Sequence, residues 1–100
     1  MAYDRTLLSE EEVAAFLAAH PFWRREGQEL CRTYEFPSFP EGVAFVQRVA
    51  EVAERHDHHP DIEVRYRKVT LRLCTHDAGG LTFRDPQVAD ECDRAFGKGG

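Results

Sequence analysis

The spacing of hydrophobic and polar residues changes along the first third of the chain. Ser9 and Glu12 form a capping box, which predicts a helix that begins there and ends at residues 20–21, where His precedes Pro. After this helix the apolar residues no longer recur at helical spacing. Residues 22–25 and 28–36 are expected to form two strands with a turn between them.

The same succession of one helix and two strands is predicted again further along. Ser38 and Glu41 form a second capping box, and the helix is expected to run to about Arg55, since Pro60 blocks a longer one. Residues 62–73 then alternate with period two, which predicts a hairpin that turns at residues 67–68 and is buried on one face. The predicted apolar stripe of the second helix comprises Val46, Val49, Ala50 and Ala53, flanked by Phe45 and Val52.

A last helix is expected to start near Thr82 or Asp85, and its inner side would carry Val88, Ala89, Cys92 and Phe96. The order α-β-β-α-β-β-α predicts an α+β fold, with a four-stranded antiparallel sheet and helices packed on one face. The other face of the sheet would be open unless a second copy of the chain covers it, so a homo-oligomer is expected.

Composition narrows the class of protein. At 100 residues, the chain is expected to form a single domain over residues 1–100. Eighteen acidic against thirteen basic residues disfavour direct nucleic-acid binding, and no apolar run is long enough to span a membrane. The first residues lack a signal-peptide pattern. Three widely spaced cysteines without a Cys-x-x-Cys pair predict a reduced, cytoplasmic protein without a disulfide framework.

Reactive chemistry is concentrated in histidines. His56, His58 and His59 lie within residues 55–60, and His76 follows later in the chain. Imidazole titrates near ~6.5, so it exchanges protons at ordinary pH. A histidine cluster among carboxylates indicates proton transfer on a small molecule first and metal binding second.

The predicted fold brings three of these histidines together. The cluster lies where the second long helix ends and the hairpin begins, and His76 lies just past the end of the hairpin. Because a hairpin brings its two outer ends together, His58, His59 and His76 are expected to share one pocket rim. His56 and His20 are instead interpreted as residues that end helices.

At these residues the sequence resembles the pterin-4a-carbinolamine dehydratases. The family pattern is an acidic residue, three residues, His-His-Pro, an aromatic residue, a third histidine and a later aspartate. It is matched here by Glu54, His58, His59, Pro60, Tyr66, His76 and Asp85. Residues 75–82 also look like the Thr-His…Gly-Leu-Thr segment of the family, and the resemblance covers nearly the whole chain.

The resemblance implies dehydration of 4a-hydroxytetrahydrobiopterin to quinonoid dihydropterin, the recycling step after aromatic amino-acid hydroxylation. His58 and His76 would be the acid–base pair, His59 would bind and orient the pterin, and Asp85 would be a polar partner in the catalytic set. The flanking residues expected to supply hydrogen bonds to the substrate are Asp57, Cys74, Thr75 and Asp77. The family needs no metal or cofactor and assembles as homodimers or homotetramers.

One position departs from the family pattern, and several alternatives stay open. Ile62 stands where many relatives have Trp, which leaves open a difference in either the pocket wall or the preferred pterin. Asp85, followed by Pro86, also suits a helix N-cap. Zinc is a rival ligand for the histidines, although adjacent His58 and His59 diverge and no His-x-x-x-His spacing is present. A non-catalytic interaction module, similar to the animal relatives that are dimerisation partners of a homeodomain transcription factor, is the other rival.

Overall fold

The computed structural model describes residues 4–98, and these form the predicted helices and strands in the predicted order. In chain order the elements are α1 (Glu10–Ala19), β1 (Arg24–Glu26), β2 (Glu29–Glu35), α2 (Phe39–His56), β3 (Asp61–Arg65), β4 (Lys68–Leu73), the 3₁₀ helix η1 (His76–Ala78) and α3 (Arg84–Lys98). The α+β prediction is confirmed.

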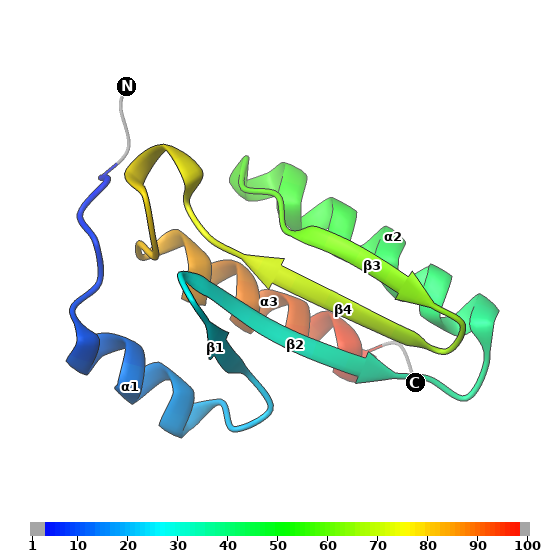
Figure 1. The fold of residues 1–100 in the computed structure, drawn as a ribbon. Coiled ribbons are helices and arrows are strands. Elements are labelled where there is room, and N and C mark those ends of the chain that lie inside the picture. Colours follow the sequence, from blue (N-terminus) through cyan, green and yellow to red (C-terminus); the bar gives the residue numbers. More distant parts are fainter. Residues whose placement is uncertain (1–3, 99–100) are drawn as a thin grey trace.

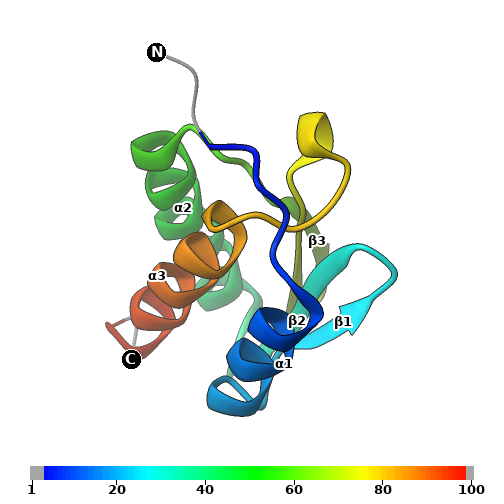
Figure 2. The same ribbon diagram turned by 90° about the vertical axis from the view of Figure 1, so that its left-hand side faces the viewer.

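The four strands form one antiparallel sheet with the order β1-β2-β4-β3. Its central strands, β2 and β4, come from different hairpins, so the sheet joins the two halves of the chain. The three α-helices lie on the same side of this sheet (Figures 1 and 2). The expected arrangement of helices on one face is therefore confirmed.

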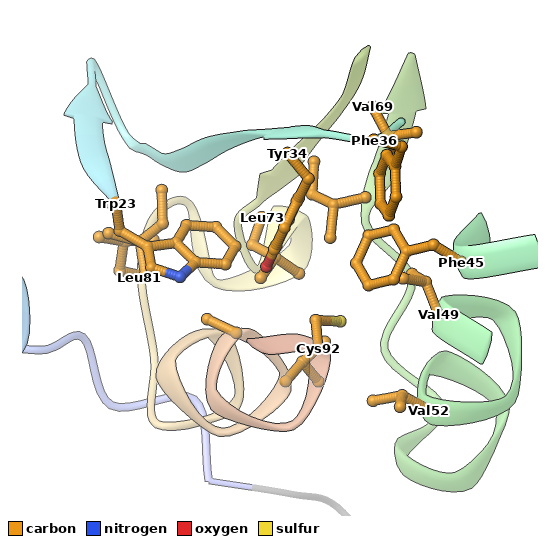
Figure 3. Close-up of a cluster of buried hydrophobic side chains, with 14 of the residues drawn as sticks. Trp23, Tyr34, Phe36, Phe45, Val49, Val52, Val69, Leu73, Leu81 and Cys92 are labelled. Carbon is orange, nitrogen blue, oxygen red and sulfur yellow. The ribbon is translucent and has the colours of Figure 1, made fainter. Parts of the chain in front are cut away.

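The core lies between the sheet and the helices. In the register of β2 and β4, Leu30 pairs with Leu73 and Tyr34 with Val69, so their side chains share the face that meets the helices. Figure 3 shows Tyr34 and Phe45 close together in this core, and their ring centroids are 4.6 Å apart. Complete burial of an apolar side chain of this size stabilises the fold by about 1.5–3 kcal/mol.

Capping fixes where the first two α-helices begin. The Ser9 hydroxyl accepts a hydrogen bond from the backbone N–H of Glu12, while the Glu12 carboxylate accepts one from the backbone N–H of Ser9. Ser38 likewise accepts from the backbone N–H of Glu41 at the start of α2. Both serines have extended backbone conformations, as expected of N-cap residues. The two predicted helix starts are confirmed.

The opposite face of the sheet is polar. Thr33 and Thr70, which are cross-strand partners, share a hydrogen bond of 2.8 Å between their hydroxyls. Arg72 donates to Glu26 at 2.8 Å, and this hydrogen bond is the main reason why the pKa of Glu26 lies below its usual value. Polar partners of this kind allow the uncovered face to meet water.

Two details of the predicted pattern are wrong. On α2 the buried residues are Gly42, Phe45, Val49, Val52 and Ala53, whereas Val46 is only half-buried and Ala50 is exposed. The hairpin turns at residues 66–67, one position earlier than expected, and all of β3 is exposed. Because β3 is an edge strand that α2 covers only in part, its alternation of apolar and polar residues does not report a buried face.

The fold gathers the functional segments at one end of the sheet. The last residues of α2, the helix η1 and the first turn of α3 lie together there, and the hairpin turn lies at the opposite end (Figure 1). Asp61 at the start of β3 pairs with Arg72 near the end of β4, so the two outer ends of the hairpin lie side by side. The chain before β3 is therefore next to the chain after β4.

Candidate active site

A cavity of about 340 Å³ lies at this end of the sheet, and it brings the predicted substrate-binding residues together. Its lining comes from the end of α2, from the segment that contains η1 and from the start of α3. The lining residues are Asp57, His58, His59, Cys74, Thr75, His76, Asp77 and Arg84. All the residues that were expected to contact substrate are present, and Arg84 is an addition.

A left-handed turn places two histidines at the cavity. Asp57 has φ 48° and ψ 46°, a conformation that costs a non-glycine residue about 1–2 kcal/mol. It ends α2, and the backbone N–H of His58 reaches back to the carbonyl of Ala53 at 3.0 Å. Pro60 then prevents further helix, so His58 and His59 leave α2 at a fixed angle.

His58 is held by a buried carboxylate. Its Nε2 lies 2.6 Å from Oδ1 of Asp85, and both side chains are almost completely buried. The other oxygen of Asp85 accepts hydrogen bonds from the Thr75 hydroxyl at 2.8 Å and from the backbone N–H of Thr82 at 2.9 Å. An ionised carboxylate can only accept, so Nε2 of His58 carries the hydrogen and Nδ1 is left for the cavity.

The carboxylate of Asp85 makes two kinds of contact, one with the ring of His58 and one with a backbone N–H. It orients His58 from behind the cavity wall and is not itself among the lining residues. It also satisfies a backbone N–H in front of α3. However, α3 begins at Arg84, so Asp85 lies in the first turn and the interpretation as the N-cap residue itself is wrong.

His59 also lies beside a carboxylate, but unlike His58 it is exposed to water. Its Nε2 lies 2.6 Å from Oε2 of Glu54, but the His59 side chain is half exposed and Glu54 is mostly exposed. Water screens such a pair strongly, and its net contribution to stability is small. His59 is therefore the solvent-exposed counterpart of the buried His58.

His76 approaches from the other side of the cavity. It is the first residue of η1, is exposed, and its ring nitrogens lie 3.5 and 3.6 Å from Sγ of Cys74. Burial is the main cause of the raised pKa of the Cys74 thiol, so Cys74 stays protonated at neutral pH. The rim is completed by Asp77, which forms an ion pair of 3.2 Å with Arg5.

Arg84 is the lining residue that sequence reasoning missed. One of its guanidinium nitrogens donates to the backbone carbonyls of His56 at 2.5 Å and of Asp57 at 2.7 Å. The sequence did contain a weak signal, because a cation in the first turn of a helix is disfavoured by the helix dipole and so indicates another purpose.

Other residues of the pattern lie outside the cavity. Tyr66 occupies the hairpin turn with φ 52°, is largely exposed and does not line the cavity. Ile62 is not among the residues that line the cavity. His56 ends α2 and pairs with Glu91, and His20 caps α1, as interpreted from the sequence.

Within residues 4–98, no three His, Cys, Asp or Glu side chains are grouped so that they could hold a metal ion. Nor does any helix in this part of the chain combine the length and apolar character needed to cross a membrane.

Comparison with known proteins identifies the family. Residues 6–95 match the family described as pterin 4 alpha carbinolamine dehydratase. A protein of Nocardia farcinica that bears the name "Putative pterin-4-alpha-carbinolamine dehydratase" is 53% identical over 87 residues, which are 87% of this chain and 92% of that protein. One from a Roseiflexus species is 50% identical over 88% of this chain and 95% of its own length. This chain belongs to the pterin-4a-carbinolamine dehydratase family.

A solved structure agrees with the fold. The crystal structure of a transcriptional coactivator/pterin dehydratase from Brucella melitensis superposes with a TM-score of 0.85 at 28% identity, covering 90% of this chain and 98% of that one. The predicted family resemblance is confirmed over most of the chain.

Proposed function

We propose that this protein is a 4a-hydroxytetrahydrobiopterin dehydratase that releases water to give quinonoid dihydropterin. The observation that carries the proposal is the buried His58–Asp85 pair on the wall of a cavity with His76 at its rim. Membership of the dehydratase family and identities of about half with proteins assigned to this reaction support it.

The reaction needs two proton movements and no change of oxidation state. The bond between C4a and the hydroxyl oxygen breaks, the proton on the neighbouring ring nitrogen N5 is removed, and a C4a–N5 double bond forms. One group must protonate the departing hydroxyl while another accepts the N5 proton. General acid–base catalysis of this kind contributes about 10²–10⁴-fold in rate.

His58 suits the role of the base. Asp85 holds the hydrogen on Nε2, which leaves the lone pair on Nδ1 to take the proton from N5. The carboxylate then stabilises the imidazolium that forms, as it does in other His–Asp pairs. Burial of His58 within the cavity wall holds its ring against Asp85.

His76 suits the role of the acid, because it faces the same cavity from a separate segment and its exposure allows it to regain a proton from water. His59 would orient the pterin ring from the rim. The remaining polar lining, which consists of Asp57, Cys74, Thr75 and Asp77, would supply hydrogen bonds to the donors and acceptors of the pterin. In this proposal the cavity binds one pterin and the chemistry uses side chains alone.

The test is to generate 4a-hydroxytetrahydropterin chemically and to follow its dehydration by ultraviolet absorbance. Wild type is expected to be faster than buffer, and His58→Ala and His76→Ala are each expected to be about 10²–10⁴-fold slower. His56→Ala is the matched control, because this neighbouring histidine points to Glu91 and does not line the cavity. A wild-type rate equal to that of buffer would refute the proposal.

We also propose that the protein is a cytoplasmic homodimer or homotetramer. All three cysteines are free thiols, which suits a reducing compartment. The edge strand β3 exposes Ile62 and Val64, and the neighbouring α2 exposes Phe39 and Val43, each between 37% and 47% exposed. An apolar edge strand next to an apolar helix surface favours pairing with a second copy.

Light scattering after size-exclusion chromatography tests the assembly. Wild type is expected to elute as an oligomer, and Val64→Lys as a smaller species, because a charge on the edge strand opposes strand pairing. Phe22→Lys is the control, since Phe22 is more exposed but lies before β1, outside this surface. A wild-type monomer at all concentrations would contradict the proposed assembly and leave the proposed reaction untouched.

A further inference from the structure

The carbonyl groups at the end of α2 are satisfied in an unusual way. A helix leaves its last four carbonyls without intrahelical partners. Here the backbone N–H groups of Asp57 and His58 turn back to the carbonyls of Ala53 and Glu54. Beyond Arg55, the carbonyls of His56 and Asp57 accept hydrogen bonds from the Arg84 side chain of another helix.

The hydrogen bonds from Arg84 are made at Asp57, whose backbone conformation is strained. Asp57 is one of two non-glycine residues with positive φ within residues 4–98, and it directly precedes His58 and His59. Its left-handed backbone fixes the direction in which the chain leaves α2. The bonds from Arg84 flank this residue, to the carbonyl before it and to its own carbonyl, so the guanidinium locks both peptide groups of the turn.

Arg84 and Asp85 are neighbours on α3, and they hold the same histidine in different ways. Asp85 holds the ring of His58 through Nε2, and Arg84 holds the backbone that carries it. Each contact spans more than twenty-five residues of sequence and joins α2 to α3. Residues of α3 therefore hold both the ring of His58 and the backbone that carries it.

We propose that Arg84 is a positioning residue, whose guanidinium locks the left-handed turn at Asp57 and thereby sets the orientation of His58 and His59 towards the substrate. The inference rests on the proposed function for its kinetic consequence and on the contacts above for its structural one. Misplacement of a catalytic group by about 1 Å can cost about 10²-fold in rate, so a small movement of this turn has a large effect.

Kinetics with the full chain test the catalytic consequence. Arg84→Ala is expected to lower kcat by about 10- to 100-fold with a smaller change in KM, because the bound substrate meets misoriented histidines. Arg84→Lys should recover part of kcat, since an ammonium can still reach one of the carbonyls. Millimolar guanidinium added to Arg84→Ala should also raise kcat, which an effect on folding alone would not produce.

Nitrogen NMR of the histidine rings tests the structural consequence without any turnover. In wild type, His58 should show one tautomer with the hydrogen on Nε2, and Arg84→Ala should shift and broaden the signals of this ring, because movement of its backbone alters the hydrogen bond to Asp85. Arg94→Ala is the matched control, because Arg94 lies on the same helix and pairs with Asp90, away from the cavity. Its kinetics and His58 signals should equal those of wild type.

The outcomes separate this inference from the proposed function. If Arg84→Ala is folded and its kcat, KM and His58 signals all match wild type, the positioning role is wrong although the reaction stands. If wild type itself does not dehydrate the pterin, the proposed function is wrong, and the NMR comparison still decides whether Arg84 holds His58.

Discussion

Several carboxylates of helix α3 accept hydrogen bonds from other elements, and two of them, Asp85 and Asp93, differ in the chemistry of their partners. Asp85 receives Nε2 of His58, the Thr75 hydroxyl and a backbone N–H. Asp93 receives the indole N–H of Trp23 at 2.9 Å, a guanidinium N–H of Arg32 at 2.8 Å and the Tyr34 hydroxyl at 2.5 Å.

The difference lies in what the partners can do. All three side-chain donors to Asp93 keep their protons at neutral pH, and burial, followed by the hydrogen bond to Asp93, raises the pKa of Tyr34 further. His58 can exchange its proton and lines a cavity. The two aspartates therefore differ in their partners: Asp93 holds groups of the core, and Asp85 holds a histidine that lines the cavity.

Among the substitutions that test this difference between the carboxylates, Asp85→Asn should give the largest change, a fall in kcat. Asp85→Asn is expected to lower kcat by about 10²–10⁴-fold, because an amide can donate to His58 and stabilise the wrong tautomer. Ultraviolet assay of dehydration measures kcat, and thermal unfolding shows whether the variant is folded. Wild-type kcat in a folded Asp85→Asn variant would remove the distinction between the two aspartates.

Asp93→Asn should lower stability and leave kcat unchanged. The free energy of unfolding is expected to fall by about 3 kcal/mol, because Arg32 loses its buried counter-ion and the core loses its polar anchor. Urea denaturation measures this change. The kcat of the folded fraction should equal that of wild type, and a fall in kcat without a fall in stability would contradict a structural role.

Another carboxylate of α3, Glu91, forms an ion pair with Arg55 that water screens, because Arg55 is well exposed. The hydrogen bond from Arg55, with a further contribution from His56, lowers the pKa of Glu91 from its ordinary value of 4.5. Its stabilisation is therefore present above pH 4.5 and is lost as the pH falls through the lowered pKa. Glu91→Gln should cost less than about 1 kcal/mol at pH 7, since Arg55 is well exposed.

Urea denaturation at a series of pH values measures that difference. The two free energies of unfolding should converge on acidification below pH 4.5, where the carboxylate of wild type becomes protonated in both states. A difference that grew as the pH fell would mean that Glu91 is not stabilised by these cations.

The smallest effect is expected for the exposed counterpart of the His58–Asp85 pair. Glu54→Gln removes the carboxylate beside His59, and kcat should change by less than about 5-fold, the equivalent of about 1 kcal/mol. The same ultraviolet assay measures it. A loss as large as that of Asp85→Asn would show that burial does not separate the two histidines.

Much of this contrast was visible in the sequence, but not all of it. The three histidines of the site and the residues that flank them were predicted, because their chemistry and their spacing to the hairpin ends are local properties. Asp85 was predicted as a site residue with its role left open. Arg84 was missed, because its contacts to the end of α2 cross 27 and 28 residues and no periodic pattern reports such a contact.

The sequence by itself determined the order of elements, the capped helix starts and the histidine chemistry, since capping and periodicity act over a few neighbouring residues. Only the tertiary structure decided which aspartate supports His58, which cation holds the turn before it, and that β3 is an exposed edge. These features depend on how α3 and the sheet pack against α2, and that packing is set by the whole core.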